Sequence, residues 1–446
     1  YRPEGERPAC SPAAARFLER MLNQQDTALL PELLRLLDEA GRRAPDDLLP
    51  HVLEHGAKVP RLRPALLPIV GERGRWLGAL NPAWRYAAVD LGDWRSLRAA
   101  WEADPAGRPA LAEIVRRRDA ATSRHLLEST WRTEGDVARR DLIRALEVEL
   151  SLADEPFLER ALDDRDAQVR RKAVDLLAAI PGSRLIARMT AQAGDILTLA
   201  GGELTPRFPA VSDSMVRDGV VRPTSSPQSA SERSRLLVQT VGVIPPAHWE
   251  ERFATAPDDI ARAALAGKWP RTLLTALSTA ALRGRDRRWA AALLEADSYG
   301  ERAGLLLPLL SPVECFARLA PRLSAGDTEG VIVFLRRWPG PWDEPTGRAL
   351  LDFFGHAAGQ DPDTRTSPTL RYLARSFGHQ CPPSLADHAA VIAANCPANK
   401  AWEACLHMLV TTLQSRQRIY AAINDGASPQ AKGQSAKSAD SSKRRE

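Results

Sequence analysis

The residues best suited to catalysis in this chain are His51, Glu54 and His55, which have the spacing H-x-x-E-H. On a helix, this spacing puts two imidazoles one turn apart, where both could bind zinc while the carboxylate acts as a general base. Pro50 precedes the motif and Gly56 follows it, so little more than one helical turn is left. No later glutamate lies in a recognisable third-ligand motif. The sequence therefore favours a short surface helix with two exposed histidines over a zinc hydrolase.

A second set of candidate metal ligands lies near the C-terminus and consists of His379, Cys381, His388, Cys396, Cys405 and His407. It contains none of the closely spaced cysteine pairs that most zinc sites use. Its last two members are two positions apart and would face different sides of a helix. We therefore expect buried cysteines and no metal. The sequence also lacks phosphate-binding glycine-rich loops and the G-x-S-x-G motif, so we expect no cofactor and no catalytic centre.

Three short basic clusters recur along the chain, at 116–118, 139–140 and 170–172. The last two form what we call the basic ladder, which consists of Arg139, Arg140, Arg170, Arg171 and Lys172. One interpretation is that the ladder binds an acidic protein partner or phosphate. The other is that one arginine per repeat pairs with an aspartate of a neighbouring turn, such as Asp136 or Asp163.

The elements that would position these residues are clearest between residues 154 and 180. Pro156 fits the first turn of a short helix, which ends in a polar turn at 163–166. Asp166 is placed to cap a second helix. The apolar residues of that helix fall on one face and are Val169, Ala173, Leu176, Leu177 and Ile180. Proline and glycine at 181–182 then end the hairpin.

The same plan recurs along the chain. The hairpin at 154–180 matches the preceding segment when Val137 is aligned with Val169 and Arg139 with Arg171. A weaker repeat relates 246–253 to 312–319. Such hairpins cannot bury their apolar stripes alone and must stack on neighbours. The sequence therefore predicts an all-α fold, a HEAT-like α-solenoid of antiparallel helical hairpins in two arrays.

Composition places the boundaries of these arrays. Residues 195–231 are rich in Gly, Pro, Ser and Thr without a helical period, which predicts an irregular linker or surface loop. The predicted arrays are therefore an N-terminal one at 1–194 and a C-terminal one at 232–425. Residues 426–446 are rich in Ala, Ser, Lys and Gln and predict a disordered basic tail.

Charge and apolar runs restrict the class of protein. The chain has 446 residues and a net charge of +5. Five basic and two acidic residues in the last 21 supply +3 of that charge, so the remainder is close to neutral, which argues against an extended nucleic-acid groove. No apolar run approaches the ~20 residues of a membrane span. Five cysteines without a pairing pattern fit a cytoplasmic protein. The chain starts at Tyr1 rather than Met, as expected of a fragment.

Three segments carry a resemblance to a known family. They are RGRWLGALNPAW at 73–84, the turn and helix start at 162–171, and MVRDG at 215–219. They resemble a bacterial family of HEAT-repeat proteins of unknown function, whose genes lie beside those of MoxR-type AAA+ ATPases, von Willebrand A proteins and SWIM zinc-finger proteins. The resemblance implies a partner-binding role near an ATPase system. It implies no catalytic residues.

These observations predict a non-enzymatic scaffold or adaptor that presents a curved helical surface to a protein partner. The resemblance nominates a MoxR-type ATPase or a von Willebrand A protein as that partner. The alternative is a nucleic-acid-binding solenoid of the kind that HEAT-like DNA glycosylases represent, which needs a continuous basic groove. A zinc hydrolase is the least favoured of the three.

Overall fold

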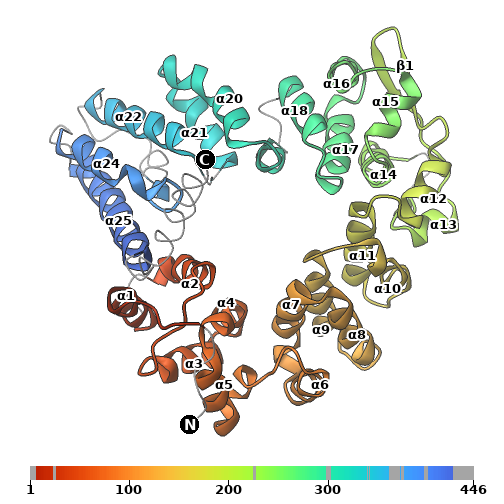
Figure 1. Ribbon diagram of the computed structural model, residues 1–446. Helices are drawn as coiled ribbons and strands as arrows, with labels where there is room; N and C mark the ends of the chain where they lie inside the picture. The colour runs from red at the N-terminus through yellow and green to blue at the C-terminus, as the bar shows by residue number, and fades with distance from the viewer. Residues whose placement is uncertain are drawn as a thin grey trace, which may run out of the picture. The chain divides into compact units, whose positions relative to one another are not determined.

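The computed structural model of this protein is mostly helical (Figure 1). It describes residues 7–23, 27–224, 228–297, 303–338, 340, 342–360, 372, 376–395 and 400–424. Within these ranges the one sheet is an antiparallel hairpin of β1 (Leu197–Ala200) and β2 (Glu203–Pro206). The prediction of an all-α fold is confirmed. The predicted tail at 426–446 lies outside the described residues.

The chain divides into two compact units. Unit 1 consists of residues 1–111, 375–395 and 403–446, and unit 2 consists of 112–374 and 396–402. These boundaries differ from those of the predicted arrays, since unit 1 combines both ends of the chain. The predicted linker at 195–231 contains the β-hairpin, helix α13 and the start of α14. Among the described residues, no helix has the length and apolar character needed to cross a membrane.

Unit 1 is built from short helices near the N-terminus and two helices near the C-terminus. The helices are α1 (Pro12–Leu22), α2 (Leu30–Glu39), α3 (Leu49–Lys58), α4 (Arg63–Leu66), α5 (Gly71–Leu80), α6 (Trp94–Ala103), α24 (Ala386–Ala394) and α25 (Lys400–Asn424). Helix α7 (Arg108–Arg118) spans the boundary between the units, and the first residues of α25 belong to unit 2. Turns of 3₁₀ helix occur at Thr27–Leu29, Pro60–Leu62, Leu67–Ile69, Pro82–Ala87, Pro105–Gly107 and Pro383–Leu385.

The core of unit 1 joins segments from opposite ends of the chain. Apolar residues of α1 to α4 bury Ile419 and Ile423 of α25 in one cluster. The ribbon shows α25 ending beside α1 and α2 (Figure 1). The Arg416 guanidinium is buried and donates to both carboxylate oxygens of Glu32 on α2, at 2.8 Å. It also donates to the carbonyl of Gly378 at 2.8 Å. This charge-assisted pair therefore fixes the end of the chain, in α25, against its beginning, in α2.

Unit 2 contains the predicted hairpin region and the helices that follow it. Its helices are α8 (Ala120–Thr130), α9 (Asp136–Arg144), α10 (Glu155–Ala161), α11 (Ala167–Ala179), α12 (Arg184–Ala193), α13 (Asp213–Arg217), α14 (Ala230–Val241), α15 (Ala247–Phe253), α16 (Pro257–Ala266), α17 (Pro270–Arg283), α18 (Arg287–Ala296), α19 (Ala303–Leu306), α20 (Pro312–Ser324), α21 (Thr328–Arg337) and α22 (Glu344–Gln360). Its 3₁₀ turns are Ala145–Glu147, Leu152–Asp154 and Leu307–Leu309.

The hairpin of α10 and α11 forms as its sequence predicts. The Asp166 carboxylate accepts from the backbone amides of Gln168 and Val169, at 2.8 and 3.1 Å, and so caps α11. The apolar residues predicted for one face of α11 are all buried: Val169, Ala173, Leu176, Leu177 and Ile180. Helix α11 packs on α10 and on α9, which is the stacking that the stripe requires.

The predicted alignment of the two hairpins is wrong by one position. It pairs Val137 with Val169, yet Val137 is 67% exposed and Val169 is fully buried. The structure instead matches Arg139 with Arg170, and both donate to backbone carbonyls just before their helices. We call this alignment the burial register. It also matches two buried pairs, which are Leu126 and Leu127 in one hairpin and Phe157 and Leu158 in the next. Burial, rather than residue identity, sets the alignment.

Leu177→Ala should destabilise the protein by about 2–5 kcal/mol, because it leaves a cavity in a fully buried helix face. The matched control is Val137→Ala, which removes exposed apolar surface and should stay within about 0.5 kcal/mol. Urea unfolding followed by circular dichroism measures both. Equal losses would contradict the burial register.

Candidate binding site

The H-x-x-E-H motif lies on helix α3, where its glutamate is bonded to two neighbouring side chains. The Glu54 carboxylate accepts from the Trp84 indole N–H at 3.2 Å and pairs with Lys58 at 3.2 Å. These bonds, chiefly that from Trp84, hold the pKa of Glu54 below its usual range, whereas a general base needs a higher one. His51 is exposed. His55 is half-buried, and burial lowers its pKa.

Helix α3 is longer than its sequence predicts. It continues through Gly56 to Lys58 instead of ending after one turn. A Cβ atom at Gly56 would clash with the Tyr86 hydroxyl, which donates to the Leu53 carbonyl at 2.8 Å. Gly56 is therefore needed for the packing of the 3₁₀ segment that contains Tyr86 and does not end the helix.

The C-terminal histidines and cysteines form no metal centre in the described part of the chain, where no three His, Cys, Asp or Glu side chains could share an ion. Cys381 is buried and Cys405 is half-buried, while Cys396 lies outside the described residues. Burial lowers the pKa of His379. The same cause raises the pKa of Cys315 to about 12, so this thiol stays protonated and unreactive.

Purified protein should contain no stoichiometric zinc, and a chelator should leave its melting temperature unchanged. The reason is that Glu54 is bonded to Trp84 and no third ligand lies beside His51 and His55 in the described structure. Elemental analysis of the wild type, His51→Ala and His55→Ala checks this. One zinc per chain that either substitution removes would restore the hydrolase hypothesis.

Two arginines of the basic ladder are bound to aspartates of the next hairpin. The Arg139 guanidinium is buried and contacts both oxygens of Asp164 at 3.2 and 3.0 Å, as well as Asp136 at 2.7 Å. Arg140 donates to Asp166 through Nε at 3.1 Å and Nη2 at 2.5 Å. The bond from Arg140, more than any other effect, lowers the pKa of Asp166. These two residues therefore join α9 to the turn that caps α11.

The other three ladder residues differ in what they contact. Arg170 donates to the carbonyls of Asp164 and Arg165, at 2.6 and 3.0 Å, and Lys172 pairs with Glu147. Arg171 is exposed, and no side chain in the described ranges pairs with it. In the burial register Arg171 corresponds to Arg140. The position that corresponds to Asp166, the partner of Arg140, is 197, where β1 begins instead of a capped helix. Arg171 therefore remains an exposed cation without a described partner.

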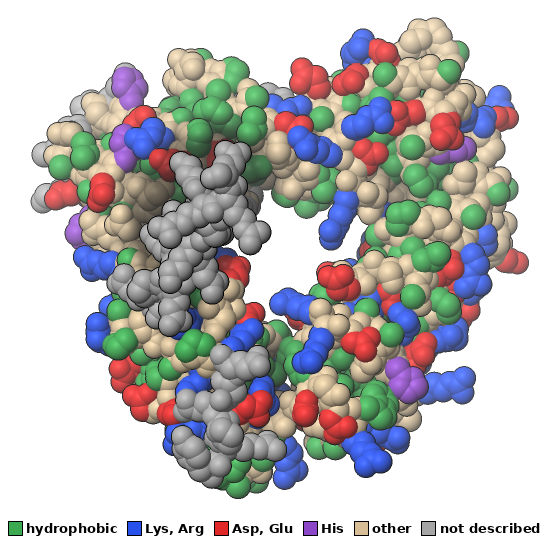
Figure 2. Space-filling model, in the orientation of Figure 1, with side chains coloured by type: hydrophobic (Ala, Val, Ile, Leu, Met, Phe, Trp, Pro, Cys, Tyr) green, Lys and Arg blue, Asp and Glu red, His purple; other side chains and the backbone are tan. Residues whose placement is uncertain are grey.

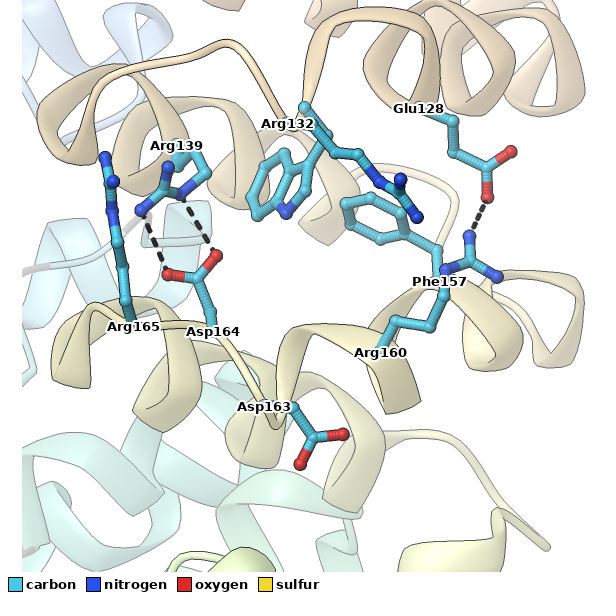
Figure 3. Close-up of a pocket in the computed structure, with 9 residues that line it drawn as sticks. Glu128, Arg132, Arg139, Phe157, Arg160, Asp163, Asp164 and Arg165 are labelled. Atoms are coloured by element: carbon cyan, nitrogen blue, oxygen red, sulfur yellow. Dashed lines mark hydrogen bonds and ion pairs between the residues drawn. The ribbon is translucent and has the colours of Figure 1, made fainter.

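A cleft of about 710 Å³ opens beside the paired ladder residues, between the hairpins of α8–α9 and α10–α11. Trp131 and Phe157 meet edge to face in its lining, with ring centroids 4.9 Å apart. Phe157 is buried, whereas Trp131 is half-buried. The remaining lining residues are all charged: Glu128, Arg132, Arg139, Arg160, Asp163, Asp164 and Arg165 (Figure 3).

Most charges in the cleft are neutralised by a partner. Arg160 pairs with Glu128 at 2.5 Å, and Arg139 pairs with Asp164 (Figure 3). Asp163 accepts from Arg217 outside the cleft at 2.8 Å. Arg132 is exposed and has no partner among the described side chains. The cleft therefore combines a half-buried tryptophan with one guanidinium that has no described partner.

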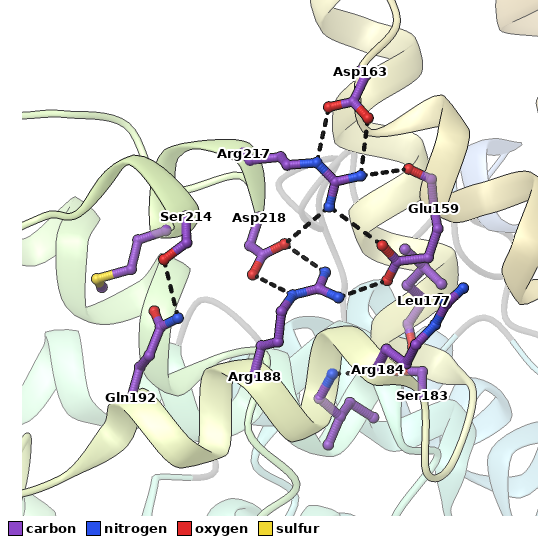
Figure 4. Close-up of polar contacts among 12 residues, drawn as sticks. Glu159, Asp163, Leu177, Ser183, Arg184, Arg188, Gln192, Ser214, Arg217 and Asp218 are labelled. Carbon is purple, nitrogen blue, oxygen red and sulfur yellow. Dashed lines mark hydrogen bonds and ion pairs between the residues drawn. The ribbon is translucent and has the colours of Figure 1, made fainter.

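Two segments that carry the family resemblance contact each other through an ion network (Figure 4). Arg217, in the segment 215–219, donates to both oxygens of Asp163 in the turn after α10, at 2.8 and 2.9 Å. Its neighbour Asp218 is buried and accepts from Arg188 on α12, at 2.9 and 2.6 Å. Arg188 also donates to Glu159 on α10 at 3.0 Å. The residues of these two segments that carry the resemblance therefore help to join α10, α12 and α13.

One known family matches this chain. A family model described as a family of unknown function, DUF5691, matches residues 2–423. The chain belongs to that family. No curated protein and no solved structure matches it. The DUF5691 match thus covers both units and the candidate cleft without assigning a reaction.

Sequence reasoning missed Trp131, Arg132 and Arg160 as site residues in this DUF5691 chain. They lie outside the basic clusters, and their placement around one cleft depends on how two hairpins stack. The sequence signal for Trp131 and Arg132 is a tryptophan directly followed by arginine after a helix. This signal is not specific, because the same type of pair recurs elsewhere, as at Trp94 and Arg95.

The stability difference between the wild type and Asp166→Asn should depend on pH. Because the folded pKa of Asp166 lies below its ordinary 3.8, the stabilisation is complete above that value. This stabilisation is lost as pH falls below 3.8 towards the folded pKa, because Asp166 binds a proton in the unfolded chain and not in the folded chain. Urea midpoints at about pH 7, 5 and 3 measure this. Asp141→Asn, a half-buried aspartate of α9 that pairs with Arg144, is the control. A difference that is the same at all three pH values would contradict the role of the Arg140–Asp166 pair.

Proposed function

We propose that this chain is a non-enzymatic scaffold that binds an acidic segment of a protein partner at the cleft in unit 2. One observation carries the proposal: the cleft places the Trp131 ring beside an unpaired guanidinium, Arg132. Tryptophan and arginine are the side chains in which binding energy concentrates at protein interfaces. The exposed Arg171 adds a second cation for the same partner.

The architecture we infer for this role is a HEAT-like solenoid, in which stacked hairpins offer a curved surface. The packing of α11 on both α9 and α10 and the recurrence of the hairpin in the burial register support that inference. In such arrays each repeat contacts its neighbours, and the surface between repeats serves for binding. The resemblance nominates a MoxR-type ATPase or a von Willebrand A protein as the partner.

The distribution of charge favours a protein partner over nucleic acid. Basic and acidic side chains are interspersed on the face drawn in Figure 2. Arg139 and Arg140, which a phosphate-binding groove would need, are bound to Asp164 and Asp166. A surface of this kind offers isolated cations and not a continuous positive track.

Charge reversal at Arg132 and Arg171 should weaken partner binding by about tenfold or more while the melting temperature stays the same, because neither side chain supports the fold. Arg140 is unsuitable for this test since it is bonded to the cap of α11. Arg271→Glu, an exposed arginine of α17 without a described partner, is the matched control. The binding partners tested are a purified MoxR-type ATPase and a von Willebrand A protein.

Calorimetry at low and high salt completes the experiment. Partner binding that weakens in Arg132→Glu and Arg171→Glu, and not in Arg271→Glu, would support the proposal. Equal affinity in all variants would contradict it. Duplex DNA binding with a log–log salt slope of about −0.9 per phosphate, removed by the same reversals, would favour the nucleic-acid alternative.

A further inference from the structure

A second concave site lies in unit 1, apart from the cleft. A groove of about 360 Å³ runs between α1 and α25. Three arginines line it: Arg16 and Arg20 from α1, and Arg418 from α25. Phe17 and three alanines form the rest of the lining, and no acidic residue contributes to it. The groove therefore carries three positive charges against an apolar floor.

The two helices that form the groove are held together firmly. The Ser11 hydroxyl donates to the Ala422 carbonyl at 2.6 Å, next to the start of α1. Ile419 and Ile423 of α25 are buried in the core that α1 also enters. The Arg416–Glu32 pair holds α25 against α2. The three arginines thus project from a fixed frame, as a binding site requires.

Two of these arginines differ from the many exposed arginines elsewhere in the chain that pair with carboxylates. Arg35, for example, pairs with Glu39 on α2 at 2.7 Å. Arg16 and Arg418 are exposed, and no described side chain pairs with either. Arg20 lies over the Phe17 ring, with its guanidinium carbon 5.7 Å from the centroid. Arg16 and Arg20 are one helical turn apart on the same face, where like charges repel.

We propose that this groove binds a small phosphate monoester with an aromatic or other flat apolar group. Guanidinium groups present planar N–H donors that match phosphate oxygens. A phosphate monoester carries up to two negative charges near neutral pH, which matches the two unpaired cations Arg16 and Arg418 better than a single carboxylate does. The half-buried Phe17 ring and the alanines would contact the apolar group. The site is independent of the partner-binding role proposed for unit 2.

Phenyl phosphate is the probe, tested on the full chain by calorimetry and thermal unfolding. Inorganic phosphate, benzoate and sodium chloride at the same ionic strength are the comparison ligands. The variant is Arg16→Gln with Arg418→Gln. The matched control is Arg61→Gln with Arg85→Gln, which removes two exposed arginines of the same unit that have no described partner.

Phenyl phosphate should raise the melting temperature of the wild type and of the control, more than inorganic phosphate or benzoate does. The groove variant should lose at least tenfold in affinity. Without ligand it should unfold at the same or a higher temperature than the wild type, because the substitutions relieve repulsion between like charges. A purely structural role for these arginines predicts the opposite, a lower melting temperature.

Three results would overturn the proposal. The first is an equal shift with sodium chloride and phenyl phosphate, which would show charge screening only. The second is binding of benzoate or inorganic phosphate that is as tight as binding of phenyl phosphate. Tight binding of benzoate would show that the groove does not require a phosphate group, and tight binding of inorganic phosphate would show that it does not require an apolar group. The third is equal binding of phenyl phosphate by the groove variant and the control, which would place the binding elsewhere.

Discussion

The fold of unit 2 depends on arginine–carboxylate pairs that join one helical hairpin to the next. The most buried is Arg116 with Asp154, whose side chains are both fully inaccessible and whose Nη2 and Oδ2 atoms lie 2.5 Å apart. Arg124 reaches the other oxygen of Asp154 at 2.7 Å. Removing one partner of such a pair leaves an unpaired buried charge, which is far more costly than losing a surface ion pair. Apolar stripes drive the stacking, but these pairs restrict how it occurs.

The physical reason is that apolar contact has little directionality, whereas a bidentate ion pair has a fixed geometry. A hairpin displaced by one residue would still bury leucines against leucines. It would not keep Arg139 on Asp164 or Arg140 on Asp166. A second network performs the same task where α10, α12 and α13 meet, and consists of Arg188, Arg217, Asp163 and Asp218. The family segments at 162–171 and 215–219 follow from this requirement.

This use of charge also explains where binding can occur. Arginines that join hairpins have their donors occupied and cannot take a ligand without weakening the fold. Cations without a described partner remain available for recognition, and four of them lie at or near the two proposed sites: Arg132 and Arg171 in unit 2, and Arg16 and Arg418 in unit 1. The two sites differ in kind, because the cleft combines one such cation with mostly neutralised charges, while the groove has three cations and no acid. A protein segment suits the first and a compact dianion the second.

The sequence by itself determined the helical class and the α10–α11 hairpin, including the Asp166 cap and the buried stripe to Ile180. These features depend on residues within one or two helical turns of each other, so local pattern is enough to predict them. The sequence also placed the Arg139–Arg140 pair beside aspartate turns, but it did not distinguish pairing from recognition. Tertiary structure shows the pairing, because the Asp164 and Asp166 partners come from the next hairpin. It alone brought Arg16 and Arg418 to one groove, since residues at opposite ends of a chain share no periodic signal. It also brought Trp131 and Arg132 to one cleft, because cleft formation depends on how neighbouring helices stack.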